Sequence, residues 1–245
     1  MGAHSGPNIV EDGLVFSFDM RNIVKSWKGR PTTNLVRSPF SSSFAKSVEV
    51  ESLSNENSFY PGGNVLKIKN NGYLAFVRDQ DRFNVGNTYT VSWFVKYYSN
   101  ETINFSWGGS HSGDRSTFTF NLISGEITNL NIVSNNIYGA NYLEDGWWQV
   151  YYSSYLSGSY FYPQINLNGD FILGGIQIEQ GFVPSYFVNG SRNSTEALID
   201  LTSNHVITLQ NISYNNNNTF EFDGTDDYSF SNWNFIRSNF TNFMF

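Results

Sequence analysis

Cysteine is absent from this chain of 245 residues, and charged residues are scarce. Without cysteine there are no disulfides, no thiol catalysis and no thiolate ligands for a metal. Charged residues make up only 14% of the sequence, and the 14 lysines and arginines are scattered along it. Because the net charge is -7, the chain offers little attraction to a phosphate backbone, and nucleic acid is not an expected partner.

Long apolar runs are missing as well. No stretch approaches the roughly 20 residues that cross a bilayer as a helix, so we expect no membrane partner. The first residues, MGAHSGPNIVEDG, lack the basic and apolar regions of a signal peptide. We therefore expect a protein found outside a cell to arrive there by another route, such as lysis that releases it as part of a particle.

Signatures of catalysis are also lacking. The three histidines are far apart and show no zinc-site spacing, and no G-x-S-x-G nucleophile elbow or glycine-rich phosphate loop is present. Acid-base catalysis needs a close pair of carboxylates, whereas the acidic residues here fit single positions on the wet faces of strands. We predict that the protein is not an enzyme and that Glu179 hydrogen-bonds to nearby backbone.

Aromatic residues, by contrast, make up 18% of the chain, and there are 21 glycines. Aromatic side chains fit a pleated surface, while Gly and Asn suit tight turns. These features predict an all-β protein of about ten strands, a jelly-roll β-sandwich with a small additional β segment formed by the N- and C-terminal parts. The longest expected strand is Thr88–Tyr98, and Asn70–Gly72 predicts a hairpin between Val65–Ile68 and Tyr73–Phe76.

The segment Leu173–Phe187, LGGIQIEQGFVPSYF, has the alternation of a half-buried strand and then breaks at Gly181 and Pro184. It resembles the end of the carbohydrate-binding-module-type jelly rolls found in phage tail, fibre and head-decoration proteins. Three upstream segments fit the same template in order: Thr88–Lys96, Phe118–Thr128 and Asp145–Tyr152. The resemblance implies a carbohydrate-binding-module-like jelly roll at residues 35–192.

The chain on either side of that domain carries a second resemblance. Ile9–Asp19 is similar to the start of concanavalin-A-like (LamG-like) domains in phage structural proteins, and Ile199–Leu209 and Phe220–Tyr228 resemble later parts of such domains. The economical interpretation is a jelly roll inserted into a loop of a partial concanavalin-like β segment, because loop insertions cost little when the host ends stay close. This segment comprises residues 14–34 plus 193–245, and residues 1–13 form an N-terminal arm.

Sugar binding by such a module would use exposed aromatic rings beside hydrogen-bonding side chains. One tryptophan lies in a glycine-rich segment, SWGGSHSGD, where a large ring has few reasons to be buried. Trp147 is adjacent to another tryptophan, so the two point to opposite faces of a strand and one of them is structural. The candidate glycan-binding residues are Trp107, Tyr97, Tyr98 and Trp148. Contact with neighbouring subunits is the alternative role for such rings.

An acidic turn, D-G-T-D-D, is a candidate calcium site. Its three carboxylates, Asp223, Asp226 and Asp227, are the hard oxygen ligands that calcium prefers. The same motif is also simply a favourable turn. We expect no other cofactor.

The final segment, SNWNFIRSNFTNFMF, concentrates large apolar side chains that a free monomer would have to hide. These side chains either pack on the protein's own core or contact a neighbouring subunit in an oligomer. The candidate subunit contacts are Trp233, Phe235, Phe240, Phe243 and Phe245.

Together these features predict a non-enzymatic structural protein at the surface of a tailed-bacteriophage virion: a head decoration, a neck protein or a tail or fibre adaptor. It would bind other virion proteins, assemble as a homo-oligomer and in addition contact host surface glycans. The alternative is a free carbohydrate-binding module or lectin that acts alone. A third hypothesis is a glycan depolymerase, which would release reducing ends from a polysaccharide.

Overall fold

The structure is a computed structural model of the full chain. It describes residues 28–36, 44–46, 48–53, 58–60, 63–69, 71–76, 83–107, 116–132, 137–156, 164–199, 206–214, 220–221 and 225–231. Within these ranges the protein is all-β, and each pair of neighbouring strands is antiparallel. A search of the described residues finds no helix with the length and apolar character of a membrane span.

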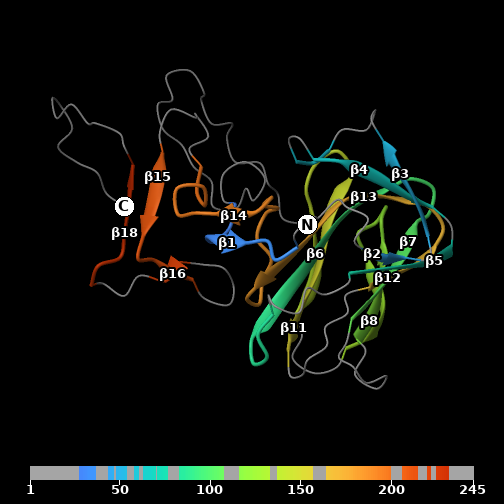
Figure 1. Ribbon diagram of the computed structural model, residues 1–245, viewed down its shortest axis with the longest axis horizontal. Coiled ribbons are helices and arrows are strands. Elements are labelled where there is room, and N and C mark those ends of the chain that lie inside the picture. Colours follow the sequence, from blue (N-terminus) through green and yellow to red (C-terminus); the bar gives the residue numbers. More distant parts are fainter. Residues whose placement is uncertain are drawn as a thin grey trace.

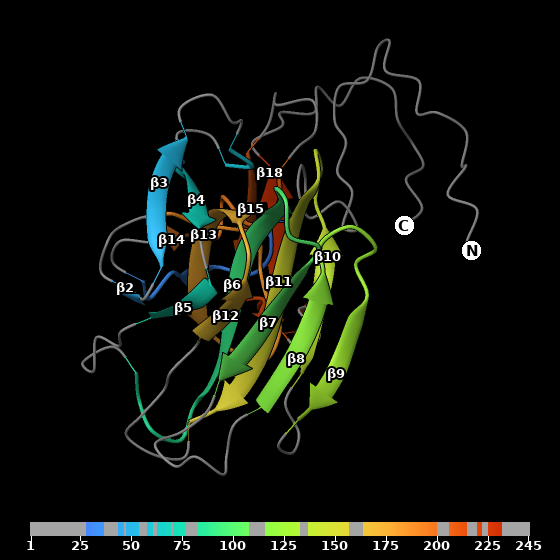
Figure 2. The ribbon, with the colours of Figure 1, turned by 90° about the vertical axis from the view of Figure 1, so that its right-hand side faces the viewer.

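Two six-stranded sheets form a jelly-roll sandwich, which confirms the predicted fold class (Figure 1). We call one of them the central sheet; its strands, in spatial order, are β10 (Tyr138–Tyr142), β11 (Trp147–Tyr155), β6 (Thr88–Tyr97), β13 (Phe171–Gln180), β4 (Val65–Lys69) and β3 (Glu49–Leu53). We call the other the distal sheet; its strands are β2 (Phe44–Lys46), β5 (Asn71–Phe76), β12 (Gln164–Asn168), β7 (Thr102–Trp107), β8 (Ser116–Asn121) and β9 (Ile127–Asn131). Figure 2 views the molecule from the side of the distal sheet.

The two sheets differ in how many of their faces are buried. Strand β8 alternates buried and half-buried residues, so one face of the distal sheet packs inward and the other faces outward. Strands β6 and β13 are buried along almost their whole length, which means that both faces of the central sheet are covered. The main hydrophobic core, with Trp93, Phe105 and Phe118 among its members, lies between the sheets.

The far face of the central sheet carries a second, aromatic cluster. Phe59 stacks on Phe94 with ring centroids 4.4 Å apart, and it also contacts Trp147 at 5.3 Å and Phe187 at 5.4 Å. Gly174 lies directly beneath these rings, and a Cβ atom there would approach Phe59 and Trp147 to 2.7 Å. Glycine at this position therefore lets the cluster sit against the sheet.

The two ends of the jelly roll lie side by side. Strand β1 (Thr32–Thr33) pairs with β14 (Ser191–Arg192), and the backbone N–H of Lys28 donates to Ala197 O at 2.8 Å. Beyond them are two short ribbons, which pair β15 (Ile207–Gln210) with β18 (Tyr228–Ser231) and β16 (Ser213–Tyr214) with β17 (Phe220–Glu221). Figure 1 shows β1 and β14 between the sandwich and these ribbons. Adjacent ends are what an inserted domain requires, and the proposed domain boundaries stay a prediction.

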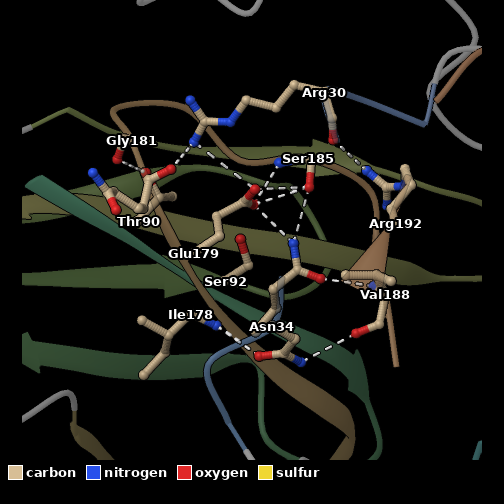
Figure 3. A network of polar contacts seen from close by, with 12 residues as sticks. Arg30, Asn34, Thr90, Ser92, Ile178, Glu179, Gly181, Ser185, Val188 and Arg192 are labelled. Atoms are coloured by element: carbon tan, nitrogen blue, oxygen red, sulfur yellow. Dashed lines mark hydrogen bonds and ion pairs between the residues drawn. The ribbon is translucent and has the colours of Figure 1, made fainter. Parts of the chain in front are cut away.

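Asn34 fixes the incoming segment to the edge of β13. Its side-chain oxygen accepts from the N–H groups of Ile178 and Val36, both at 3.1 Å, and its amide nitrogen donates to Ile176 O and Val188 O, both at 3.2 Å. Figure 3 shows the bonds to Ile178 and Val188. Strand β4 pairs with β13 only as far as Leu173, so these bonds satisfy backbone groups of β13 beyond the reach of β4.

Glu179 lies next to this edge and is fully buried. Its Oε1 accepts from the backbone N–H of Ser185 at 2.7 Å and from Gln177 Nε2 at 2.8 Å, and its Oε2 accepts from Ser185 Oγ at 2.9 Å. Arg30 approaches Oε2 to 4.0 Å (Figure 3). The prediction that Glu179 hydrogen-bonds to nearby backbone is therefore confirmed.

Most strands fall where the sequence places them, with one clear exception. The strands expected at Thr88–Tyr98, Trp147–Tyr155 and Phe171–Glu179 match β6, β11 and β13 within a residue. The hairpin predicted at Asn70–Gly72 is wrong. β4 belongs to the central sheet and β5 to the distal sheet, and Asn71 and Gly72 pair with β12 instead. The chain crosses between sheets at this point, because the apolar residues of the two strands face the shared core from opposite sides. The predicted strand at 14–19 lies outside the described residues.

We predict that Asn34→Ala lowers the free energy of unfolding by about 3 kcal/mol or more, because buried backbone groups of β13 would lose their partners. Urea unfolding followed by tryptophan fluorescence measures the effect. Asn84→Ala is the matched control, since Asn84 is exposed and its hydrogen bonds are made by its backbone. Equal losses in the two variants would contradict the role assigned to Asn34.

Candidate functional site

The outward face of the distal sheet is polar but carries no charge along five of its strands. The sequences of β5, β12, β7, β8 and β9 contain no Asp, Glu, Lys or Arg. In β7 and β8 the apolar residues turn toward the core, as Ile103 and Phe105 do in β7, so the alternate positions face outward. Those positions are occupied mainly by Asn, Ser and Thr.

The strand register aligns these polar residues in rows across the sheet. Tyr73 in β5 lies opposite Asn166 in β12, Asn166 lies opposite Asn104 in β7, and Asn104 lies opposite Thr119 in β8. The side chain of Tyr73 is 40% exposed, and the three residues beside it are half-buried. A neighbouring row places Gln164, Ser106 and Thr117 side by side. We call these two rows the amide face.

Hydrogen bonds between side chains hold the amide face in place. Asn129 Nδ2 donates to Thr119 Oγ1 at 3.1 Å, and Thr119 Oγ1 donates to Asn104 Oδ1 at 2.7 Å. Asn166 Nδ2 donates to Ser106 Oγ at 3.3 Å and accepts from Gln164. Because these groups are already fixed, a ligand would meet an ordered set of donors and acceptors without first paying to order it.

Such a surface suits a neutral, hydroxyl-rich ligand. Amide and hydroxyl groups both donate and accept hydrogen bonds, as sugar hydroxyls do, and an aromatic ring can cover the apolar face of a pyranose. The five strands also lack any charge that would favour an ionic ligand over a neutral one. The amide face, with Tyr73 at its margin, is therefore our candidate glycan-binding surface.

Trp107, the first residue predicted to bind glycan, does not lie on this face. Its side chain is only 1% exposed, and its ring stacks on Tyr152 with centroids 3.8 Å apart. It ends β7 on the core side, so the prediction of an exposed ring is wrong. The glycine-rich segment begins after Trp107, and within β7 the two-residue alternation directs the ring inward with Phe105.

The other predicted aromatic residues are divided between core and surface. Trp147 is buried, and Trp148 packs against Phe120 while its indole N–H donates to Leu122 O at 3.0 Å. Trp148 is thus held in the structure rather than presented as a platform. Tyr97 and Tyr98, at the end of β6, are 41% and 45% exposed, and their role in glycan binding stays a prediction.

The calcium and subunit-contact predictions are only partly within the described residues. The Asp226 carboxylate accepts a hydrogen bond from Asn211 Nδ2 at 2.8 Å, which links the residue after β15 to the segment that leads into β18. Asp227 directly precedes β18. Among the described residues no group of three metal-ligating side chains is found, and Asp223 lies outside them. The aromatic candidates from Trp233 to Phe245 lie outside them as well.

The amide face was missed by the sequence analysis, although a signal for it exists. The outward positions of β7, β8 and β12, read as alternate letters in TINFSW, STFTFN and QINLN, are all amides or hydroxyls. A surface strand normally mixes such residues with Lys or Glu. The absence of Lys and Glu from all three of these strands distinguishes this sheet.

Comparisons with known proteins give structural similarity alone. No family model matches the chain, and no curated protein matches it. The chain is similar to the CBM22-1 xylan-binding domain of Xyn10C from Paenibacillus barcinonensis, at 12% identity over 63% of this chain and 97% of that one, with a TM-score of 0.39. It is also similar to the CBM22-1–GH10 modules of xylanase 10B from Clostridium thermocellum complexed with xylohexaose, at 15% identity over 67% of this chain and 30% of that one, again with a TM-score of 0.39. At this level the similarity does not bear on what the chain binds.

We predict that Trp107→Ala destabilises the fold by about 3–5 kcal/mol, because it removes a large ring from the middle of the core. Tyr98→Ala, at an exposed position, should lower the free energy of unfolding by about 1 kcal/mol or less, because only the contact of the Tyr98 ring with the Lys67 ammonium, 3.6 Å from the ring centroid, is lost. Chemical denaturation of both variants measures the difference. A Trp107→Ala protein as stable as the wild type would contradict the buried, stacked position of this ring.

Proposed function

We propose that the chain is a non-enzymatic adhesion protein whose jelly roll binds neutral glycans through the amide face. The observation that carries this proposal is the pair of rows of hydrogen-bonded amides and hydroxyls across five strands without a charged residue. A flat face of this kind would take several sugar units of an extended chain, since its polar groups continue from β12 to β9.

The position of Glu179 supports a binding role over catalysis. This carboxylate is fully buried, and both its oxygens are occupied by Ser185 and Gln177. A general acid or nucleophile in glycoside hydrolysis must instead reach the scissile bond beside a second carboxylate. Glu179 is therefore a structural group, and the depolymerase hypothesis has no support from it.

We further propose that the protein acts on the surface of a tailed-bacteriophage virion and contacts other virion proteins. The support is the resemblance of its sequence segments to phage jelly-roll and concanavalin-like domains and the aromatic C-terminal residues. Figure 1 adds that the distal sheet faces away from β1, β14 and the ribbons. An anchor on the ribbon side would therefore leave the amide face free to meet a host glycan.

We predict that Asn104→Ala and Asn166→Ala each weaken binding to a neutral oligosaccharide about tenfold, because each removes hydrogen bonds that the sugar would share. Calorimetric titration against a panel of neutral glycans that includes xylohexaose measures the loss. Because the surface lacks charge, the affinity should also be the same at low and high salt.

Asn84→Ala is the control for this series, since Asn84 lies outside the distal sheet. If both variants of the amide face bind with the affinity of the wild type, or if the affinity of the wild type falls strongly at high salt, the glycan binds elsewhere. Unfolding curves on the same samples separate lost binding from lost structure.

The virion setting has its own test, which is quantitative mass spectrometry of purified particles from the source phage. Hundreds of copies would indicate a head decoration, and a few to tens would indicate a neck, tail or fibre protein. Absence from the particle would exclude the virion role and leave a free carbohydrate-binding module or lectin.

A further inference from the structure

A pocket of about 550 Å³ lies on the opposite side of the central sheet from the distal sheet. Its walls come from segments far apart in the sequence, namely Lys28, Phe59 and Tyr60, Glu144, and residues 186–199. The aromatic cluster that contains Phe59 and Phe187 forms its apolar side. This volume is in the range of small-ligand sites, and the pocket is separate from the amide face.

Two cations, Lys28 and Arg192, line the pocket. Arg192 is only 6% exposed, and its guanidinium donates to the backbone carbonyls of Tyr186 and Arg30. A guanidinium has five N–H donors, and Arg192 makes no other hydrogen bond within the described residues. Within the same residues neither Arg192 nor Lys28 forms an ion pair with a carboxylate. Buried positive charge of this kind is costly, and an anion would compensate it.

Lys28 is held close to an aromatic ring in the pocket wall. Its Nζ lies 4.1 Å from the centroid of the Tyr186 ring. Burial, and after it the charge of Arg192, lowers the pKa of the Lys28 ammonium to about 8, while Glu144 opposes the shift. Burial likewise lowers the pKa of Arg192 to about 10, while the charges of Glu179 and Glu196 oppose the shift. The environment therefore disfavours both charges in the free protein.

The carboxylates of the pocket are at its exposed margin. Glu144 and Glu196 are both exposed, and Glu196 accepts from the backbone N–H of Asn193 at 2.9 Å. Exposed carboxylates are screened by water and accept hydrogen bonds from hydroxyls, whereas a second negative charge on a ligand would be repelled by them. The pocket thus combines a cationic, aromatic interior with a rim that favours hydroxyl groups and disfavours dianions.

We propose that this pocket binds an acidic sugar, with its monoanionic carboxylate directed to Arg192 and Lys28 and its ring packed beside the aromatic wall. The planar guanidinium pairs in a bidentate manner with carboxylates and phosphates alike, so the exposed carboxylates of Glu144 and Glu196 are what disfavour a dianion. Glu144 and Glu196 would accept hydrogen bonds from the hydroxyl groups. This site is additional to the amide face and does not require that face to bind glycan.

The test titrates the full chain with sodium D-glucuronate at constant ionic strength and monitors the NMR chemical shifts of the backbone amides. D-Glucose is the neutral counterpart. Sodium acetate and sodium phosphate are the comparison anions. We expect shifts at residues 186–199 with glucuronate, and at least tenfold weaker effects with glucose, acetate and phosphate. Lys28→Met should weaken glucuronate binding about tenfold. Lys96→Met is the control and should leave the affinity unchanged, because the Lys96 ammonium lies above the Trp147 ring and does not line the pocket.

The pH dependence has a defined sign. An anion prefers the protonated form of Lys28, so glucuronate affinity should fall about fivefold between pH 7 and pH 9, as Lys28 loses its proton. The other titratable groups that line the pocket around Lys28 are Tyr60, Glu144, Tyr186, Arg192 and Glu196. Burial raises the pKa of Tyr186 to about 12 and lowers the pKa of Arg192 to about 10, so Tyr186 stays neutral and Arg192 mostly protonated between pH 7 and pH 9.

Stability supplies a second readout. Because the folded protein disfavours the charge of Lys28, Lys28→Met should raise the thermal unfolding midpoint of the free protein at pH 7 while it weakens binding. A lower midpoint would mark Lys28 as a structural residue and count against the proposal, as would equal binding of glucose or phosphate. If Asn104→Ala loses neutral-glycan binding and still binds glucuronate, the pocket is confirmed as a site that is independent of the amide face.

Discussion

The requirement that buried backbone groups be paired governs the edge of β13. The pairing of β4 with β13 ends at Leu173 of β13. Beyond it, the backbone groups of Ile176 and Ile178 form hydrogen bonds with the Asn34 side chain and the N–H of Leu35. These bonds fix the segment that leads into β1, and β1 in turn pairs with β14. The lining of the cationic pocket is built on the same segments, so its geometry depends on this edge.

The sequence predicts the strands better than it predicts their partners. Alternation and β-branched or aromatic content place β6, β11 and β13 almost to the residue, because these properties act locally. An Asn-Gly step is also a local signal, yet Asn71 and Gly72 lie inside β5 and pair with β12, which follows about ninety residues later in the chain. Which sheet a strand joins is decided by long-range packing, and short motifs carry little information about it.

The candidate sites show the same division. That Glu179 is structural could be inferred, since a single carboxylate within a buried strand has few other roles. That Trp107 is buried could not, because the glycines beside it suggest a loop while the ring itself stacks on Tyr152 from a strand remote in sequence. The amide face needs the register of β12 with β7 before its separate Asn and Gln residues become one surface.

The pairing of β1 with β14 brings the two ends of the jelly roll together, as the predicted insertion requires. Thr33 and Ser191, linked through their hydroxyls at 2.9 Å, bring the incoming and outgoing chain together at one point. A different sandwich with the same two adjacent ends could take its place by recombination at these strands without moving the ribbons beyond them. Recognition and attachment would then be able to diverge separately, with new binding faces acquired on an unchanged base.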